Sequence, residues 1–191
     1  MSVDLQSRRV NVMEYEGKDH LLSVVRGARA GFYDLIDGLT PEQWGAEIVQ
    51  HVYMGPIPAF IYIGFQLMDY TTHSWDIRAG LGLTSPIPVD QAGALIPFMF
   101  YVLLPSTIDP AEAGFDATWG VRVSGDDGGS WVLTLAGGKL SAAEGGLAGQ
   151  PVVFNFDPSD FVLTCFQRVS GGAAIGDQDL ARRIRRLWFK I

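Results

Sequence analysis

The spacing of apolar residues changes near residue 105, and this change limits the folds that the chain can adopt. Before that point, apolar residues recur every three or four positions, as in His20–Leu39, which is the spacing of a helix with one apolar face. From Thr107 onward, glycine becomes frequent and apolar residues alternate with polar ones, which is typical of half-buried strands. The sequence therefore predicts an α+β protein, with a helical domain over residues 1–105 and, over residues 106–191, a small antiparallel sheet with helices on one side.

Three long helices are expected in the first domain. They cover His20–Leu39, the stretch from the end of Gly55–Pro58 to Ala79, and Asp90–Leu104. Gly55–Pro58 contains two prolines, and we expect it to break the chain before the second helix. Pro97 is expected to kink the third helix, because proline lacks the N–H group that the helix needs. Together these segments resemble a partial antiparallel helical bundle.

Asp126–Gly129 is the strongest turn signal in the second domain, because Asp-Gly and Gly-Gly pairs suit a tight hairpin. Asp157 and Asp177 are expected to cap two helices, the last of which continues through Trp188. Gly171–Gly176 is expected to be a loop. Four strands are expected, over Thr118–Val123, Ser130–Leu135, Lys139–Ala143 and Pro151–Phe156.

The charge balance and the cysteine content argue against several classes of protein. The 191 residues include 14 lysines and arginines and 21 aspartates and glutamates, and this net charge of −7 argues against a general nucleic-acid binder. Cys165 is the sole cysteine, so no intramolecular disulfide can form, and its apolar neighbours predict a buried, inert thiol. The N-terminus lacks the apolar core of a signal peptide, and the longest apolar stretches carry prolines or are too short to span a membrane. We expect a soluble cytoplasmic protein without membrane insertion.

A short polar motif follows the apolar run of the second expected helix. Asp69 and His73 are four residues apart, so a helix places both side chains on one face, one turn apart. A carboxylate and an imidazole in this arrangement can share a divalent metal such as zinc. A structural hydrogen bond or simple exposure explains the same spacing, because one helix supplies only two ligands. Among the remaining histidines, His51 and His20 are the candidates for a third ligand.

The order of these features resembles the mycothiol-dependent maleylpyruvate isomerase family. Asp69, His73 and Asp76 stand in the places of that family's Glu-x-x-x-His motif and the aspartate that closely follows it. The strand Ser130–Leu135 and the segment Gly176–Arg183 are similar to the central strand and the closing helix of sterol-carrier-like domains. The resemblance implies a DinB-like helical metal-binding domain over residues 1–105, followed by a domain resembling sterol carrier protein 2 over residues 106–191. Family members normally begin with two more helices, one of which carries another histidine ligand.

The resemblance also implies a chemistry. A divalent metal, most simply zinc, would be held by Asp69, His73 and His51, and it would hold mycothiol or another low-molecular-weight thiol as a thiolate. The function implied is a metal-dependent, thiol-linked isomerase or transferase acting on a small unsaturated carboxylic acid. Arg168 is the candidate catalytic residue that binds this acid, and Asp76 would orient the imidazole of His73.

A second interpretation needs no catalysis. The second domain would enclose an apolar or lipid-like ligand, and the metal site would be degenerate. The sequence also allows a homodimer, because two or three helices leave apolar faces that a second copy can cover. Such a dimer would supply metal ligands from two chains. The aromatic residues that can line a cavity, or else form core, are Phe98, Phe100, Tyr101, Phe115, Trp119, Phe154 and Phe156.

Overall fold

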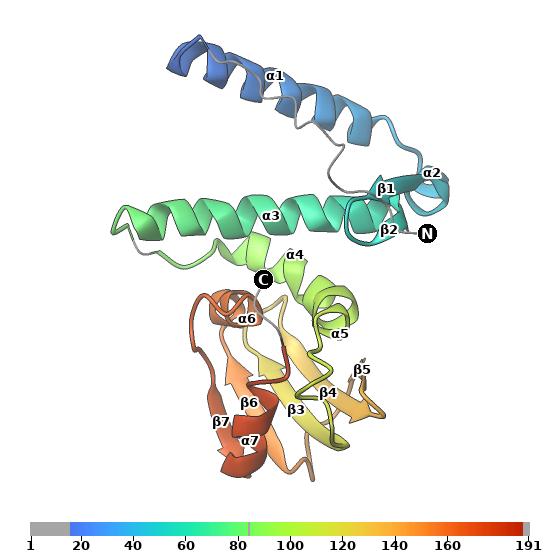
Figure 1. Ribbon diagram of the computed structural model, residues 1–191, viewed down its shortest axis with the longest axis vertical. Helices are drawn as coiled ribbons and strands as arrows, with labels where there is room; N and C mark the ends of the chain where they lie inside the picture. The colour runs from blue at the N-terminus through green and yellow to red at the C-terminus, as the bar shows by residue number, and fades with distance from the viewer. Residues whose placement is uncertain (1–15, 84, 189–191) are drawn as a thin grey trace. The chain divides into compact units, whose positions relative to one another are not determined.

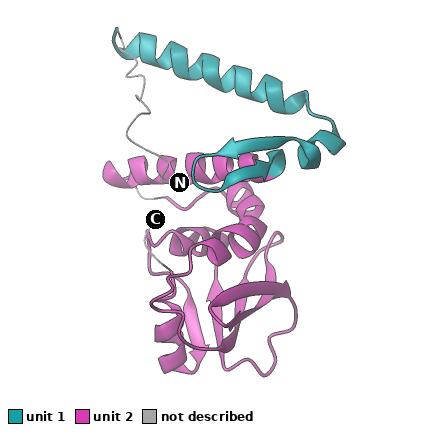
Figure 2. Ribbon diagram, turned by 45° about the vertical axis from the view of Figure 1, so that its right-hand side comes forward, with its two compact units in different colours: residues 1–60 teal, residues 61–191 magenta. Residues whose placement is uncertain are grey.

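The computed structural model describes residues 16–83 and 85–188 of the chain. It divides into two compact units, Met1–Phe60 and Ile61–Ile191 (Figure 2). The domain boundary that the sequence predicts, between residues 105 and 106, falls inside the second unit. The combination of helices with a largely antiparallel sheet confirms the α+β class.

The first unit begins with a long helix and ends with a small hairpin. Helix α1 (Lys18–Asp37) covers most of the predicted range, and the short helix α2 (Pro41–Ala46) follows it. Thr40 caps α2, because its side chain accepts a hydrogen bond from the Gln43 backbone while the Gln43 side chain accepts one from the Thr40 backbone.

The hairpin of the first unit was not predicted. Strand β1 (Ile48–His51) pairs antiparallel with β2 (Gly55–Pro58), so the segment expected to be only a chain break is a strand. Pro56 and Pro58 are compatible with pairing because each strand of a two-stranded ribbon has a free edge, where a missing N–H group leaves no partner unsatisfied.

The second unit contains nearly all of helix α3 (Ala59–Gly80), and a composite helix comes after it in the chain (Figure 1). This composite consists of α4 (Val89–Phe98), a π-helical segment (Met99–Leu103) and the short α5 (Leu104–Ser106). Pro97 lies inside α4 without ending it, and the helix widens to the π form directly afterwards. This is the local adjustment expected where proline removes one backbone donor.

Small residues let α3 and α4 approach closely. A side chain at Gly64 would lie 2.5 Å from the ring of Phe98, and the same ring packs edge-on against Phe65 at a centroid distance of 5.0 Å. Further along, the Thr71 hydroxyl donates to the Gln91 side chain at 3.4 Å.

The sheet of the second unit has five strands, in the order β5-β4-β3-β6-β7. The predicted strands appear as β3 (Ala117–Val123), β4 (Gly129–Ala136), β5 (Lys139–Glu144) and β6 (Val152–Phe156). Two expectations were wrong. The predicted loop Gly171–Gly176 contains a fifth strand, β7 (Ala173–Gly176), and β3 pairs with β6 in parallel rather than antiparallel.

Helices cover one face of this sheet, where alternate strand residues are buried. The ring of Phe100 stacks between Trp131 of β4, at a centroid distance of 4.3 Å, and Phe161, at 4.7 Å. Phe100 comes from the π-helical segment and Phe161 from α6 (Pro158–Cys165), so these aromatic rings join three elements. Val89–Ser106 is apolar and long enough to cross a membrane by composition, and 44% of it is buried. We interpret it as a core helix because Phe100 packs in this way.

The two last helices start as predicted, but the final one ends early. The side chain of Asp157 accepts a hydrogen bond from the Asp160 backbone at the start of α6. Asp177 caps α7 (Gln178–Ile184) in the same way. The prediction that this helix continues through Trp188 was wrong, because Trp188 forms a β-bridge with Ile108. Its indole also donates to the Leu104 carbonyl at 3.0 Å, so tertiary contacts draw this segment away from the helix.

Candidate ligand-binding site

A pocket of about 360 Å³ lies between the covered face of the sheet and the helices of the second unit. This volume lies within the range of small-molecule sites, which is roughly 300–1,000 Å³. Most of its lining is apolar because alternate residues of β3, β4 and β6 point to the same face as the apolar sides of α6 and α7. The apolar and aromatic residues that line it are Leu104, Trp119, Val121, Leu133, Phe154, Phe156, Phe161, Val169, Ile184 and Trp188.

Sequence reasoning found part of this lining. Trp119, Phe154 and Phe156 line the pocket as the cavity hypothesis expects. The other aromatic candidates, Phe98, Phe100, Tyr101 and Phe115, are absent from the lining. Leu133 and Ile184 were not predicted to line a cavity. Their positions, on an alternating strand and on the apolar stripe of the last helix, already indicated that both side chains face the interior.

The polar part of the lining follows the end of α6. Gln167 has a positive φ of 55°, a conformation that closes many helices. Two backbone hydrogen bonds complete this cap, from Gln167 to the Thr164 carbonyl and from Arg168 to the Leu163 carbonyl, both at 2.9 Å. The cap turns the chain sharply and leaves Gln167, Arg168 and Ser170 among the pocket residues.

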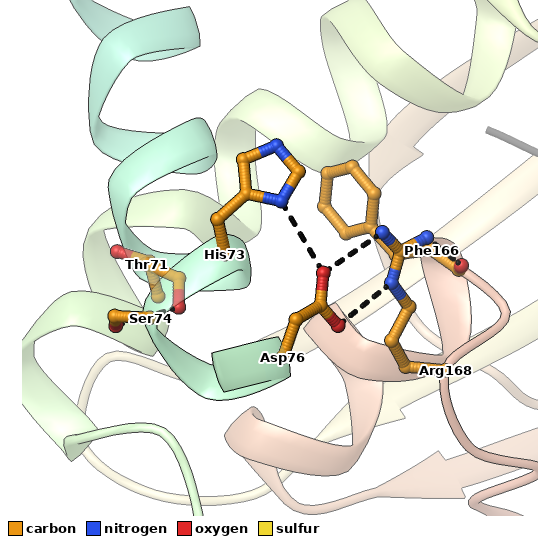
Figure 3. A network of polar contacts seen from close by, with 6 residues as sticks. All are labelled: Thr71, His73, Ser74, Asp76, Phe166 and Arg168. Carbon is orange, nitrogen blue, oxygen red and sulfur yellow. Dashed lines mark hydrogen bonds and ion pairs between the residues drawn. The ribbon is translucent and has the colours of Figure 1, made fainter. Parts of the chain in front are cut away.

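Arg168 and Asp76 form a two-pronged ion pair (Figure 3). Nε of Arg168 donates to Oδ1 of Asp76 at 3.2 Å, and its terminal nitrogen donates to Oδ2 at 3.1 Å. Nδ1 of His73 lies 3.3 Å from Oδ2 of the same carboxylate. The hydrogen bonds from Arg168 lower the pKa of Asp76, and His73 adds to this effect, while partial burial opposes it. Asp76 thus contacts the imidazole that it was expected to orient. Its pairing with Arg168 was not predicted.

The candidate metal ligands lie on α3 of the second unit and on β1 of the first. Asp69 and His73 are one turn apart on α3, and both are exposed. His51 lies in β1, where its Nδ1 accepts hydrogen bonds from the backbones of Tyr53 and Met54 at 3.3 and 3.1 Å. Across residues 16–83 and 85–188, no group of three or more histidine, cysteine, aspartate or glutamate side chains is placed to hold a metal ion. Within the second unit, Asp69 and His73 supply two of the side-chain ligands that a zinc site needs, and a further ligand would complete it.

His20 is the remaining candidate ligand, and Cys165 is buried, as its apolar neighbours predict. Nδ1 of His20 accepts a hydrogen bond from the Glu16 backbone at 3.1 Å. Cys165 lines the pocket, and burial raises the pKa of its thiol well above its ordinary value. A thiol in this environment stays protonated at neutral pH, which makes it a poor nucleophile.

Comparisons with known proteins leave the family of the chain unassigned. No family model and no curated protein matches it. Among solved structures, the chain is similar to the stereoselective inverting sec-alkylsulfatase Pisa1 from Pseudomonas sp.. The two are 22% identical with a TM-score of 0.43, over 51% of this chain and 17% of that one. The match thus spans about a sixth of the alkylsulfatase.

Proposed function

We propose that this protein binds a small apolar or amphipathic molecule in the pocket of its second unit, without catalysis. The observation that carries the proposal is the pocket of about 360 Å³ with mostly apolar walls. Removing apolar ligand surface from water stabilises a complex by about 25 cal/mol per Å². An aromatic and aliphatic lining of this kind therefore favours ligands with a substantial hydrocarbon part.

The polar residues of the lining suggest where a polar group of the ligand would lie. Arg168 is part of the lining, and its side chain is 22% exposed, so it contacts both the pocket and the solvent. A ligand with an apolar body and one polar end would match this arrangement.

The direct test fills the pocket and measures binding. We expect Val121→Phe, on the pocket face of β3, to abolish the binding of a medium-chain alcohol such as decanol in isothermal titration calorimetry. Val132→Phe, on the half-exposed face of β4, is the matched control and should bind like the parent. Circular dichroism must show both variants folded. Equal binding by the two variants would contradict a site in this pocket.

A metal-dependent, thiol-linked isomerase is the second candidate, and the contact between His73 and Asp76 favours it. An acceptor on Nδ1 would hold the imidazole with Nε2 available to a metal. The test is metal content by plasma mass spectrometry on untagged protein, with Asp69→Ala and His73→Ala as variants. Near one equivalent in the parent and none in the variants would support an enzyme. No metal in any sample after incubation with zinc would leave the binding function alone.

A further inference from the structure

We propose that the pocket selects ligands with a single carboxylate head group, and that Asp76 occupies the head-group position on Arg168 until such a ligand displaces it. This inference rests on the proposed binding function, because it concerns the polar end of the same pocket. Asp76 would thus act as a built-in competitor that weakens the binding of acids without affecting neutral ligands.

The geometry of the ion pair supports recognition of a carboxylate. Arg168 holds both oxygens of Asp76 through Nε and one terminal nitrogen, at 3.2 and 3.1 Å. Two parallel N–H donors matched to two oxygens form the arrangement by which arginine recognises carboxylate ligands. Arg168 is also a pocket residue and Asp76 is not, so a ligand in the pocket lies beside the side chain that holds Asp76.

Arg168 is positioned by contacts other than Asp76. Its NH1 donates to the Phe166 carbonyl at 3.0 Å, and its guanidinium lies 5.8 Å from the centre of the Phe166 ring. Its backbone is held by the cap at the end of α6, through the hydrogen bond to the Leu163 carbonyl. These contacts would remain if Asp76 moved away, so a ligand would meet an arginine that is already oriented.

Asp76 can leave at low cost. Its side chain is 33% exposed, so water can replace the hydrogen bonds from Arg168. His73, with a side chain that is 65% exposed, lies on the same helix three residues earlier and remains close to the released carboxylate. A ligand therefore competes with a partly solvated ion pair, and pairs of this kind contribute little to stability.

The second arginine of the lining is committed to the backbone. Arg185 donates to the carbonyls of Gly171 and Gly172 at 3.1 and 2.9 Å, and it lies over the ring of Phe154. These bonds brace the turn that precedes β7. Among the described residues, a carboxylate pairs with Arg168 but not with Arg185, so the lining offers one place for an anionic group.

The experiment compares decanoate with decanol by calorimetry, because the two share a chain length and differ in charge. Asp76→Asn should tighten decanoate binding about two- to fivefold, the range expected for removing an exposed ion-pair competitor. Arg168→Gln should weaken decanoate binding about tenfold or more, because it removes a charged two-pronged contact. Both variants should change the affinity for decanol far less than the affinity for decanoate, because decanol carries no charge.

The exposed ion pair between Arg182 and Asp179 on α7 provides matched controls. Asp179→Asn and Arg182→Gln change the net charge equally and should leave both affinities unchanged. Asp76→Ser and Arg168→Lys repeat the test if a first variant unfolds. If decanol binds but Asp76→Asn leaves decanoate affinity unchanged or weakens it, Asp76 is not a competitor and this inference fails while the binding function stands. If neither ligand binds the parent protein, the proposed function fails as well.

Discussion

Helices α1 and α4 were both predicted from the sequence, yet they differ in how many of their residues are buried. Helix α1 buries none of its 20 residues, and Leu35 on its apolar stripe is 64% exposed. Helix α4 has only ten residues, but Leu95 and Ile96 are fully buried. Isolated helices are marginal in water, and tertiary burial supplies most of their stability. A helical pattern in the sequence thus predicts a helix, whereas the contribution of that helix to stability depends on what covers its apolar face.

The largest effect should come from the buried side of this comparison. Phe100→Ala should lower the free energy of unfolding by about 3–5 kcal/mol, because the ring is fully buried between Trp131 and Phe161. Urea denaturation measures the change. Tyr101→Ala, at a half-exposed neighbour in the same segment, is the control and should cost much less. Equal losses of unfolding free energy in the two variants would show that the stacking of Phe100 does not add to the stability of the fold.

Glycine-to-alanine changes should affect the free energy of unfolding in opposite directions in α3 and α1. Gly64→Ala should destabilise the protein by about 1–3 kcal/mol, because the new side chain would meet the Phe98 ring. Gly31→Ala should stabilise it by roughly 0.5–1 kcal/mol, since no atom lies within 4 Å and alanine favours helix. Thermal unfolding followed by circular dichroism separates the two. Destabilisation by Gly31→Ala would mean that α1 is closely packed in solution.

Acid should reveal the ion pair between Asp76 and Arg168. Because the folded state lowers the pKa of Asp76 below its ordinary value of 3.8, the carboxylate stabilises the fold above that pH. The contribution is lost as the pH falls through the lowered pKa. Asp76→Asn should therefore cost below about 1 kcal/mol at pH 7 and less at pH 3. Urea midpoints at both pH values test this, and a constant difference would contradict it.

The smallest effect is expected on the exposed stripe of α1. Leu35→Ala should change the free energy of unfolding of a monomer by at most about 0.5 kcal/mol. The same stripe is one of the apolar faces that a second copy would cover in the homodimer that the sequence allows, and burial there would raise the cost of Leu35→Ala. Analytical ultracentrifugation at micromolar concentration decides between the two. A stable monomer would remove the dimer, whereas a dimer weakened by Leu35→Glu would support it.

Local patterns predicted most of the secondary structure. The long helices and the strands β3 to β6 follow from spacing and turn residues that are close in sequence. The hairpin β1–β2 and strand β7 were missed because Gly55–Pro58 and Gly171–Gly176 carry residues that usually break strands. β7 exists because Ala173 to Gly176 pair with the edge of β6. The parallel pairing of β3 with β6 could not be read from alternation, which is the same in both orientations.

The candidate site divides in the same way. The helix spacing alone placed Asp69 and His73 on one face, and it brought Asp76 within one turn of His73. The pairing of Asp76 with Arg168, 92 residues later, has no local signal. The sequence also has no signal for which aromatic residues line the pocket. Trp131 and Trp119 follow the same alternation and both are buried, but only Trp119 is among the pocket residues.

The sequence by itself determined which segments are helical or extended and which face of each is apolar, because these properties depend on neighbouring residues. Only the tertiary structure decided that α6 and α7 leave a pocket over the sheet, and that Arg168 reaches across to Asp76. Such contacts depend on how distant segments pack, and packing reflects the shapes of many side chains at once.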